Sequence, residues 1–164
     1  MIRLASKTVL LIASLTTAGT VIAHESAKPP APTPPAGTAP VSAAAATVER
    51  FSTALQAGDL ETVVTLLADD VLVLESGGAE RSREEYLGHH APGDAAFLKD
   101  AHVQRTRRTE RVEGSIAWIG TESEIHTTKD GKPMTLLSTE TMVLRRAAGG
   151  WQIVHIHWSS RPKR

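Results

Sequence analysis

A single stretch of the chain, residues 134–159 with the sequence MTLLSTETMVLRRAAGGWQIVHIHWS, decides the fold class. Two runs rich in β-branched and apolar residues, Met134–Arg146 and Trp151–Ser159, flank a short segment of small residues, Ala147–Gly150. This pattern predicts two antiparallel strands joined by a tight connection. We therefore expect a β-hairpin here.

Two more strands are predicted immediately upstream of this hairpin. His102–Glu113 is polar on both faces, whereas Ser115–Thr128 is more apolar. Lys129–Lys132 contains Asp-Gly, which favours a tight turn into the next strand. The second half of the chain therefore predicts a β-meander.

Helices are predicted before the strands. Hydrophobic residues recur at helical spacing over residues 48–55, and Gly58-Asp59 supplies a helix stop followed by an N-cap. Ser82–Glu85 is a capping box for a third helix, which we expect to end before Pro92. Helices followed by a meander predict an α+β domain, with the helices packed on one face of a curved antiparallel sheet.

The pairing of the hairpins assigns the side chains to two faces of the sheet. We expect Lys129 to pair with Lys132 in the first hairpin. If Arg146 pairs with Trp151 in the second, Glu140 lies opposite His157, and His155 lies opposite Met142. This face is mostly apolar and also carries Thr121, Ser138 and Met142, which we expect to bind a ligand. The same register places Ile156 and Trp158 on the outer face, where large apolar side chains indicate an oligomer contact.

The composition excludes several classes of function. The 164 residues contain 18 Lys and Arg against 18 Asp and Glu, so the formal net charge is zero and a nucleic-acid binder is not expected. The chain has no cysteine, which excludes thiol nucleophiles, Cys-ligated zinc and iron–sulfur clusters. No cofactor is expected, and any metal site needs His and carboxylate ligands.

The closing hairpin also carries a resemblance to a known family. Gly149–Ser159, preceded by Ser138–Val143, resembles the corresponding hairpin of SnoaL-like proteins and of the association domain of calcium/calmodulin-dependent protein kinase II. Ala57–Glu61 is similar to the family's corner between two helices. The resemblance covers about residues 48–160 and implies the cone-shaped fold named for nuclear transport factor 2. It also implies a pocket between the helices and the concave sheet, and self-association, most readily as a dimer.

The strongest local chemistry is the predicted grouping of Glu140, His155 and His157. A carboxylate beside imidazoles in an apolar cavity can perform acid–base catalysis or orient a ligand. The alternative interpretation is a buried pair with a purely structural role. The resemblance implies that all three positions are associated with the pocket.

Other candidate residues lie on the third helix and the first strand of the meander. Tyr86 and His90 share one helix face, with His89 beside them, and we expect these three to bind a ligand at the mouth of the cone. With His155, His157 and Glu140, either His89 or His90 offers a zinc or copper site, but no tight ligand motif supports one. The arginines of residues 105–111 indicate either a solvated face or, less simply, a subsite for an anion.

The N-terminal residues predict export. Arg3 and Lys7 precede Thr8–Ile22, which carries no charge. Val21-Ile22-Ala23 offers small or branched side chains at the −3 and −1 positions, which predicts signal-peptide cleavage after Ala23. We therefore divide the chain into a signal peptide (1–23), a Pro/Ala-rich linker (24–44), a SnoaL-like domain (45–160) and a short tail (161–164). The mature protein is expected in the periplasm or outside the cell, with no membrane attachment.

Three functions remain open from the sequence. The first is an exported, self-associating domain that binds a small, largely apolar molecule in its cone. The second is an acid–base enzyme, of isomerase, dehydratase or hydrolase type, that uses the His/Glu pair. The third is a periplasmic His-based binder of zinc or copper.

Overall fold

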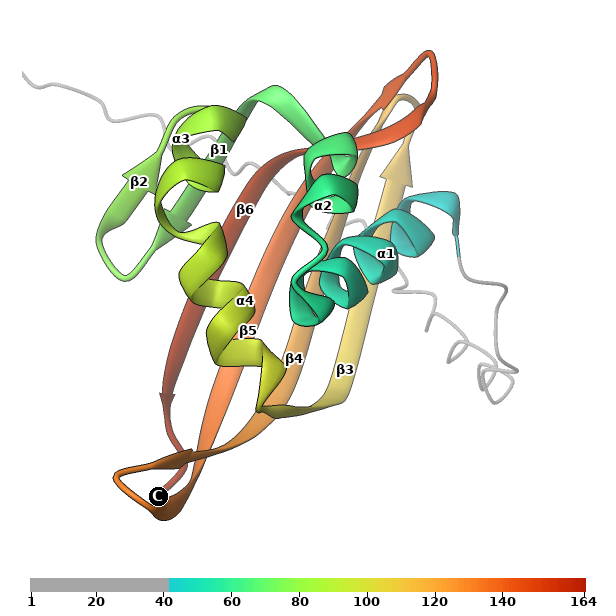
Figure 1. Cartoon of the computed structure of the whole chain (residues 1–164). Helices are drawn as coiled ribbons and strands as arrows, with labels where there is room; N and C mark the ends of the chain where they lie inside the picture. Colours follow the sequence, from blue (N-terminus) through green and yellow to red (C-terminus); the bar gives the residue numbers. More distant parts are fainter. Residues whose placement is uncertain (1–41) are drawn as a thin grey trace, which may run out of the picture. The chain divides into compact units, whose positions relative to one another are not determined.

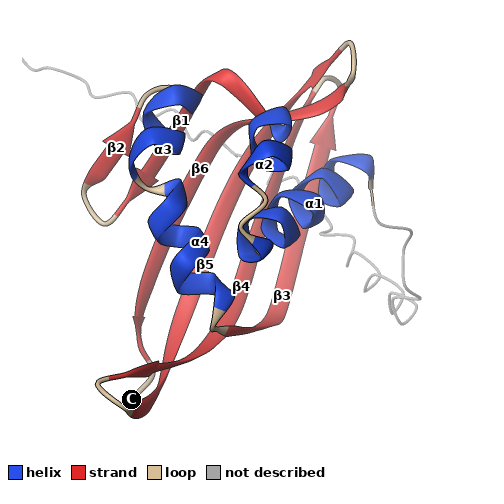
Figure 2. Cartoon of the chain, in the orientation of Figure 1, coloured by secondary structure: helices blue, strands red, loops and turns tan. Residues whose placement is uncertain are grey.

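The computed structural model describes residues 42–164, so the predicted signal peptide and most of the predicted linker lie outside the described residues. Within them, four helices lie on one face of a curved six-stranded sheet (Figure 1). The α+β class is confirmed. Figure 2 shows the helices on one side of the sheet and the long strands of the second half of the domain, which form most of that sheet.

The first part of the domain consists of two helices, then two strands, then two further helices. Their bounds are α1 Ala43–Ala57, α2 Leu60–Leu66, β1 Leu67–Glu75, β2 Gly78–Glu80, α3 Arg83–His89 and α4 Ala91–Lys99. The meander follows as β3 His102–Glu113, β4 Ile116–Lys129, β5 Lys132–Ala147 and β6 Gly150–Pro162. The strands are ordered β2-β1-β6-β5-β4-β3, and β1 runs parallel to β6, so the sheet is mixed rather than wholly antiparallel.

Capping residues set the boundaries of the first three helices as expected. Gly58 ends α1 with φ 73°, and the Asp59 side chain accepts a hydrogen bond from the Thr62 backbone N–H to begin α2. Ser82 caps α3 in the same way. α3 ends at His89, before Pro92, as expected, and Pro92 itself lies in the first turn of α4, where a missing N–H costs nothing.

The β4–β5 pairing follows the predicted register along its whole length. Lys129 pairs with Lys132, and the register continues unbroken to Ile116 and Arg145. Residues with inward side chains on these strands, such as Ile119 and Met142, are fully buried in the core.

The β5–β6 pairing contradicts the predicted register beyond its first few residues. Arg146 pairs with Trp151 and Leu144 with Ile153 as expected. Val143 then pairs with His155, so Val154 is an extra residue on β6. A one-residue bulge reverses the faces of everything that follows it. The predicted outer-face positions are therefore wrong: Ile156 is fully buried in the core, and Trp158 packs against that core.

A second bulge interrupts β3. Arg105 pairs with Ser123 and Arg107 with Glu122, which leaves Thr106 as the extra residue. The bulge places Arg105 and Arg108 on the inner face, whereas the Arg107 side chain lies outside and is 71% exposed.

Candidate functional site

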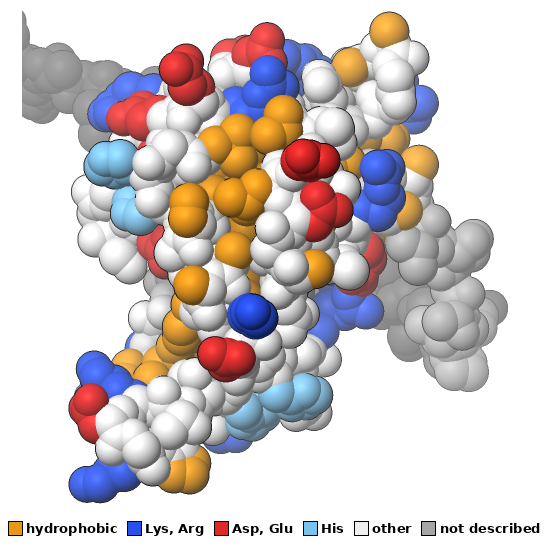
Figure 3. Space-filling model, viewed as in Figure 1, with side chains coloured by type: hydrophobic (Ala, Val, Ile, Leu, Met, Phe, Trp, Pro, Cys, Tyr) orange, Lys and Arg blue, Asp and Glu red, His pale blue; other side chains and the backbone are white. Residues whose placement is uncertain are grey.

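A cavity of about 410 Å³ lies between the sheet and helices α1 and α4. Its wall is mostly apolar, with large contributions from Phe51, Leu55, Phe97, Leu98, Ile125 and Leu136. Figure 3, viewed from the helical side, shows hydrophobic side chains gathered between the helices, with charged groups around them. A cavity of this size and lining suits a small organic molecule.

Four polar or aromatic side chains cross the inner face of the sheet in one row. Arg108 of β3 pairs with Thr121 of β4, Thr121 pairs with Glu140 of β5, and Glu140 pairs with Trp158 of β6. All four line the cavity. Because directly paired residues on one face have neighbouring side chains, the row brings a guanidinium, a hydroxyl, a carboxyl and an indole together.

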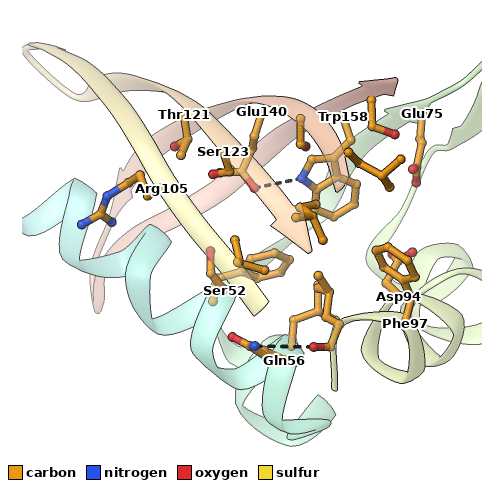
Figure 4. Close-up of a pocket in the computed structure, with 18 of the residues that line it drawn as sticks. Ser52, Gln56, Glu75, Asp94, Phe97, Arg105, Thr121, Ser123, Glu140 and Trp158 are labelled. Carbon is orange, nitrogen blue, oxygen red and sulfur yellow. Dashed lines mark hydrogen bonds between the residues drawn. The ribbon is translucent and has the colours of Figure 1, made fainter. Parts of the chain in front are cut away.

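Glu140 is the carboxyl group in the middle of this row. The Trp158 indole N–H donates a hydrogen bond of 2.8 Å to Glu140 Oε2 (Figure 4). Burial raises the pKa of Glu140 above its ordinary value, although the hydrogen bond from Trp158 and the charge of Arg108 act in the opposite direction. A carboxyl group in this setting can both accept and donate a proton.

The β3 end of the cavity is positively charged but partly neutralised. Arg105 and Arg108 both donate to Glu49 Oε1 of α1, and the Arg108 contact is 2.6 Å long. Burial alone would raise the pKa of Glu49, but the two guanidinium groups hold it below its ordinary value. Glu49 is therefore a stable anion.

The opposite end of the cavity carries carboxyl groups. Glu75 of β1 and Asp94 of α4 line it, and Figure 4 shows them on the far side of Trp158 from Arg105. Asp94 accepts a 3.0 Å hydrogen bond from the Tyr86 hydroxyl. Burial raises the pKa of both carboxyl groups, and repulsion from Asp94 adds to the effect on Glu75.

The structure separates the predicted catalytic residues. Glu140 lines the cavity, but the bulge turns His155 and His157 away from it. His155 Nδ1 lies 2.9 Å from the Leu72 carbonyl oxygen, and His157 is exposed. The predicted pairing of Glu140 with His157 is therefore wrong, and its place is taken by Trp158.

The predicted ligand-binding residues divide into two groups. Thr121 and Ser138 line the cavity. Met142 is fully buried in the core, and Tyr86 lies behind the wall, where its hydroxyl positions Asp94. His89 and His90 do not line this cavity; His90 instead contacts the buried carboxylate of Glu80.

Several residues of the cavity were not singled out as site residues from the sequence. Trp158 was placed on the outer face, and Glu75 and Asp94 were not considered. Glu49, which does not line the cavity but pairs with its two arginines, was not considered either. The arginines of β3 were noticed as a group, but only the bulge at Thr106 distinguishes the two inward residues, Arg105 and Arg108, from Arg107.

Neither a metal cluster nor a membrane span is found within residues 42–164. No group of three or more His, Cys, Asp or Glu side chains in this range is arranged to hold a metal ion. No helix in the same range is long and apolar enough to cross a membrane.

Comparison with known families and structures gives consistent matches. The SnoaL-like domain family matches residues 44–162. A crystal structure from Shewanella frigidimarina NCIMB 400, provisionally assigned as a ketosteroid isomerase, is 37% identical, covers 72% of this chain and 95% of its own, and has a TM-score of 0.69. A search of curated proteins returns no match.

More distant structures share the fold. The CaMKII hub of S. rosetta is 20% identical, covers 77% of this chain and 99% of its own, and has a TM-score of 0.66. A protein of the nuclear transport factor 2-like family from Streptomyces avermitilis, provisionally assigned as a dehydratase, is 22% identical, covers 73% of this chain and 93% of its own, and has a TM-score of 0.61. The expected nuclear transport factor 2-like fold is confirmed.

Proposed function

We propose that this chain, which belongs to the family of SnoaL-like domains, binds a small, largely apolar molecule in the cavity between its helices and its sheet. The observation that carries the proposal is the cavity itself, with a mostly apolar wall and the carboxyl group of Glu140 in its middle. The apolar wall supplies affinity through burial, and the few polar groups set the orientation of the ligand.

Binding of a neutral apolar probe tests this proposal. N-phenyl-1-naphthylamine should bind the protein with an increase in fluorescence. Ser138→Phe fills part of the cavity and should weaken binding at least tenfold. The matched control is Thr139→Phe, because Thr139 is the next residue of β5 and is exposed on the other face. Equal binding by the wild type and both variants would contradict the proposal.

Acid–base catalysis by Glu140 is a second candidate. It is supported by the shielded carboxyl group held by Trp158 and by the similarity to the protein provisionally assigned as a ketosteroid isomerase. Glu140 would take a proton from the carbon beside a carbonyl group and return it to another carbon, which shifts a double bond without net change in composition.

Deuterium exchange tests this catalytic candidate. The wild-type protein should accelerate exchange at the α-carbon of a β,γ-unsaturated ketone in D₂O, followed by NMR. Glu140→Gln keeps a hydrogen-bond acceptor for Trp158 but cannot carry the proton, so it should remove the acceleration while leaving probe binding intact. Persistence of exchange in this variant would assign the chemistry elsewhere.

We also propose that two copies of the domain associate through the outer face of the sheet. A row across this face joins Trp118, Val143, His155 and Leu72 on four neighbouring strands. Trp118 is 41% exposed and Leu72 37%, and the helices cover only the other face. Trp118→Glu should convert a dimer into a monomer in native mass spectrometry, whereas a wild-type monomer would contradict the proposal.

Export is the remaining part of the proposed function. It is supported only by the N-terminal sequence, with Arg3 and Lys7 followed by the uncharged Thr8–Ile22. The mass of the protein recovered from outside the cytoplasm should correspond to a chain that begins at His24. Recovery of the full-length chain from the cytoplasm would refute export.

A further inference from the structure

The β3 end of the cavity holds more positive than permanent negative charge. Two guanidinium groups, Arg105 and Arg108, share one oxygen of a single carboxylate, Glu49. Glu140 is the next carboxyl group in the row, and its charge depends on pH because its burial favours the neutral form. When Glu140 holds a proton, one guanidinium charge at this end has no partner among these groups.

Two polar atoms of the same row lack hydrogen-bond partners. Arg108 Nε and Thr121 Oγ1 are buried and make no hydrogen bond of good geometry, and only one other such side-chain atom, Glu80 Oε2, occurs within residues 42–164. The Thr121 hydroxyl lies close enough to Glu140 to lower the pKa of that carboxyl group, against the larger effect of burial. Unpaired buried polar atoms are unusual because they lose their bonds to water without compensation. Their concentration on two directly paired residues of the cavity wall indicates a place that a ligand completes.

The geometry of the guanidinium group selects the chemistry of that ligand. Arg108 Nη1 already donates a hydrogen bond to Glu49, so the guanidinium edge that contains Nε–H is the one available to a ligand. This edge presents two parallel N–H donors and matches the two oxygens of a carboxylate. A phosphate group has more oxygens and more charge than one guanidinium edge and one hydroxyl can satisfy. The rest of the wall is mostly apolar, and its other end carries the carboxyl groups of Glu75 and Asp94, which would repel a phosphate.

We infer that the molecule bound in the cavity is an apolar carboxylic acid, with its carboxylate against Arg108 and Thr121 and its apolar body along Phe51 and Trp158. This inference rests on the proposed binding function and names the class of the ligand. The ligand carboxylate balances the excess positive charge of the β3 end. After small adjustments of the two side chains it also supplies hydrogen-bond partners for Arg108 Nε and Thr121 Oγ1.

The proximity of Glu140 adds a consequence for pH. The charged groups around Glu140 are Arg105 and Arg108 from β3 and Glu49 from α1, while Glu75 and Asp94 face the other end of the cavity. An added carboxylate beside Arg108 disfavours the ionised form of Glu140, so binding takes up a proton. Affinity for the acid should therefore fall as pH rises through the pKa of Glu140, and Glu140→Gln should remove this component of the dependence.

A comparison of 4-phenylbutanoate with 4-phenylbutanamide tests the inference. In isothermal titration calorimetry the wild-type protein should bind the acid at least tenfold more tightly than the amide. Arg108→Met should reduce the affinity for the acid to that for the amide. Arg107→Met is the matched control, because it removes the same charge from the same strand on the outer face, and it should leave the preference unchanged.

The neutral probe separates failure of the inference from failure of the proposed function. If N-phenyl-1-naphthylamine binds but the acid has no advantage over the amide, the cavity binds apolar molecules and the carboxylate assignment is wrong. If neither the neutral probe nor the acid binds, the proposed function itself fails. Should Arg108→Met not fold, Thr121→Val decides: a reduced preference for the acid supports the inference, and an unchanged preference overturns it.

Discussion

The two ends of the cavity carry groups of opposite charge and differ in whether these groups form ion pairs. At the β3 end, Arg105 and Arg108 are paired with Glu49, whose pKa is lowered by the two guanidinium groups despite its partial burial. At the β1 end, Glu75 and Asp94 are not paired with any Lys or Arg of the described chain, and burial raises the pKa of both. One end is thus a fixed ion cluster, whereas at the other end burial favours the protonated form of both carboxyl groups.

This difference gives the two ends opposite effects on stability as pH changes. A carboxyl group with a lowered folded-state pKa contributes stability above its unfolded pKa, and this contribution is lost as pH falls. A carboxyl group with a raised folded-state pKa favours folding at low pH, and this contribution is lost as pH rises. Glu49 therefore stabilises the domain at neutral pH, whereas Glu75 and Asp94 favour it in acid.

The largest expected effect comes from removing the residue between the two ends. Trp158 bonds Glu140 and packs against Phe51 and Tyr86, with ring centroids 6.4 and 6.1 Å away. Trp158→Ala should lower the free energy of unfolding by about 3 kcal/mol, measured by urea denaturation. His157→Ala, one residue earlier and exposed, should change it by less than about 0.5 kcal/mol. Equal effects would contradict the observed β6 register.

That contrast also shows how far the sequence predicted the site. The Asp-Gly turn fixed the β4–β5 register, so Thr121, Ser138 and Glu140 were correctly placed on the inner face. The start of β5–β6 was also correct, but alternation of side chains cannot reveal a bulge. Val154 has no special backbone signature in the sequence, and its insertion exchanged His157 for Trp158 in the cavity.

The same limitation applies to the arginines of β3. Strict alternation would put Arg105 and Arg107 on one face and Arg108 on the other. The extra residue Thr106 instead unites Arg105 with Arg108 and turns Arg107 outward. The fold class and the order of helices and strands could be predicted because they depend on composition and local spacing. The site depended on two single-residue shifts whose energies come from packing across the sheet.

A smaller effect is expected from breaking the ion cluster at the β3 end. Glu49→Gln should lower the free energy of unfolding at pH 7 by about 1 kcal/mol, because the pair is partly exposed and screened. The difference from the wild type should shrink as pH falls through the folded-state pKa of Glu49. Glu122→Gln is the matched control, since its contact with Arg107 is long, at 4.0 Å, and exposed. A deficit that persists in acid would show that Glu49 acts through packing rather than charge.

The smallest expected effect comes from the acidic end and has the opposite sign. Glu75→Gln removes a carboxylate that burial and Asp94 disfavour, so at pH 7 it should raise the free energy of unfolding. Below about pH 4 the carboxyl group is protonated in both folded and unfolded chains, so the advantage should vanish. Urea denaturation at both pH values measures the change. Glu49→Gln and Glu75→Gln each remove one carboxylate charge, from opposite ends of the cavity. If both variants change the free energy of unfolding at pH 7 in the same direction, ion pairing with arginine does not distinguish the two ends.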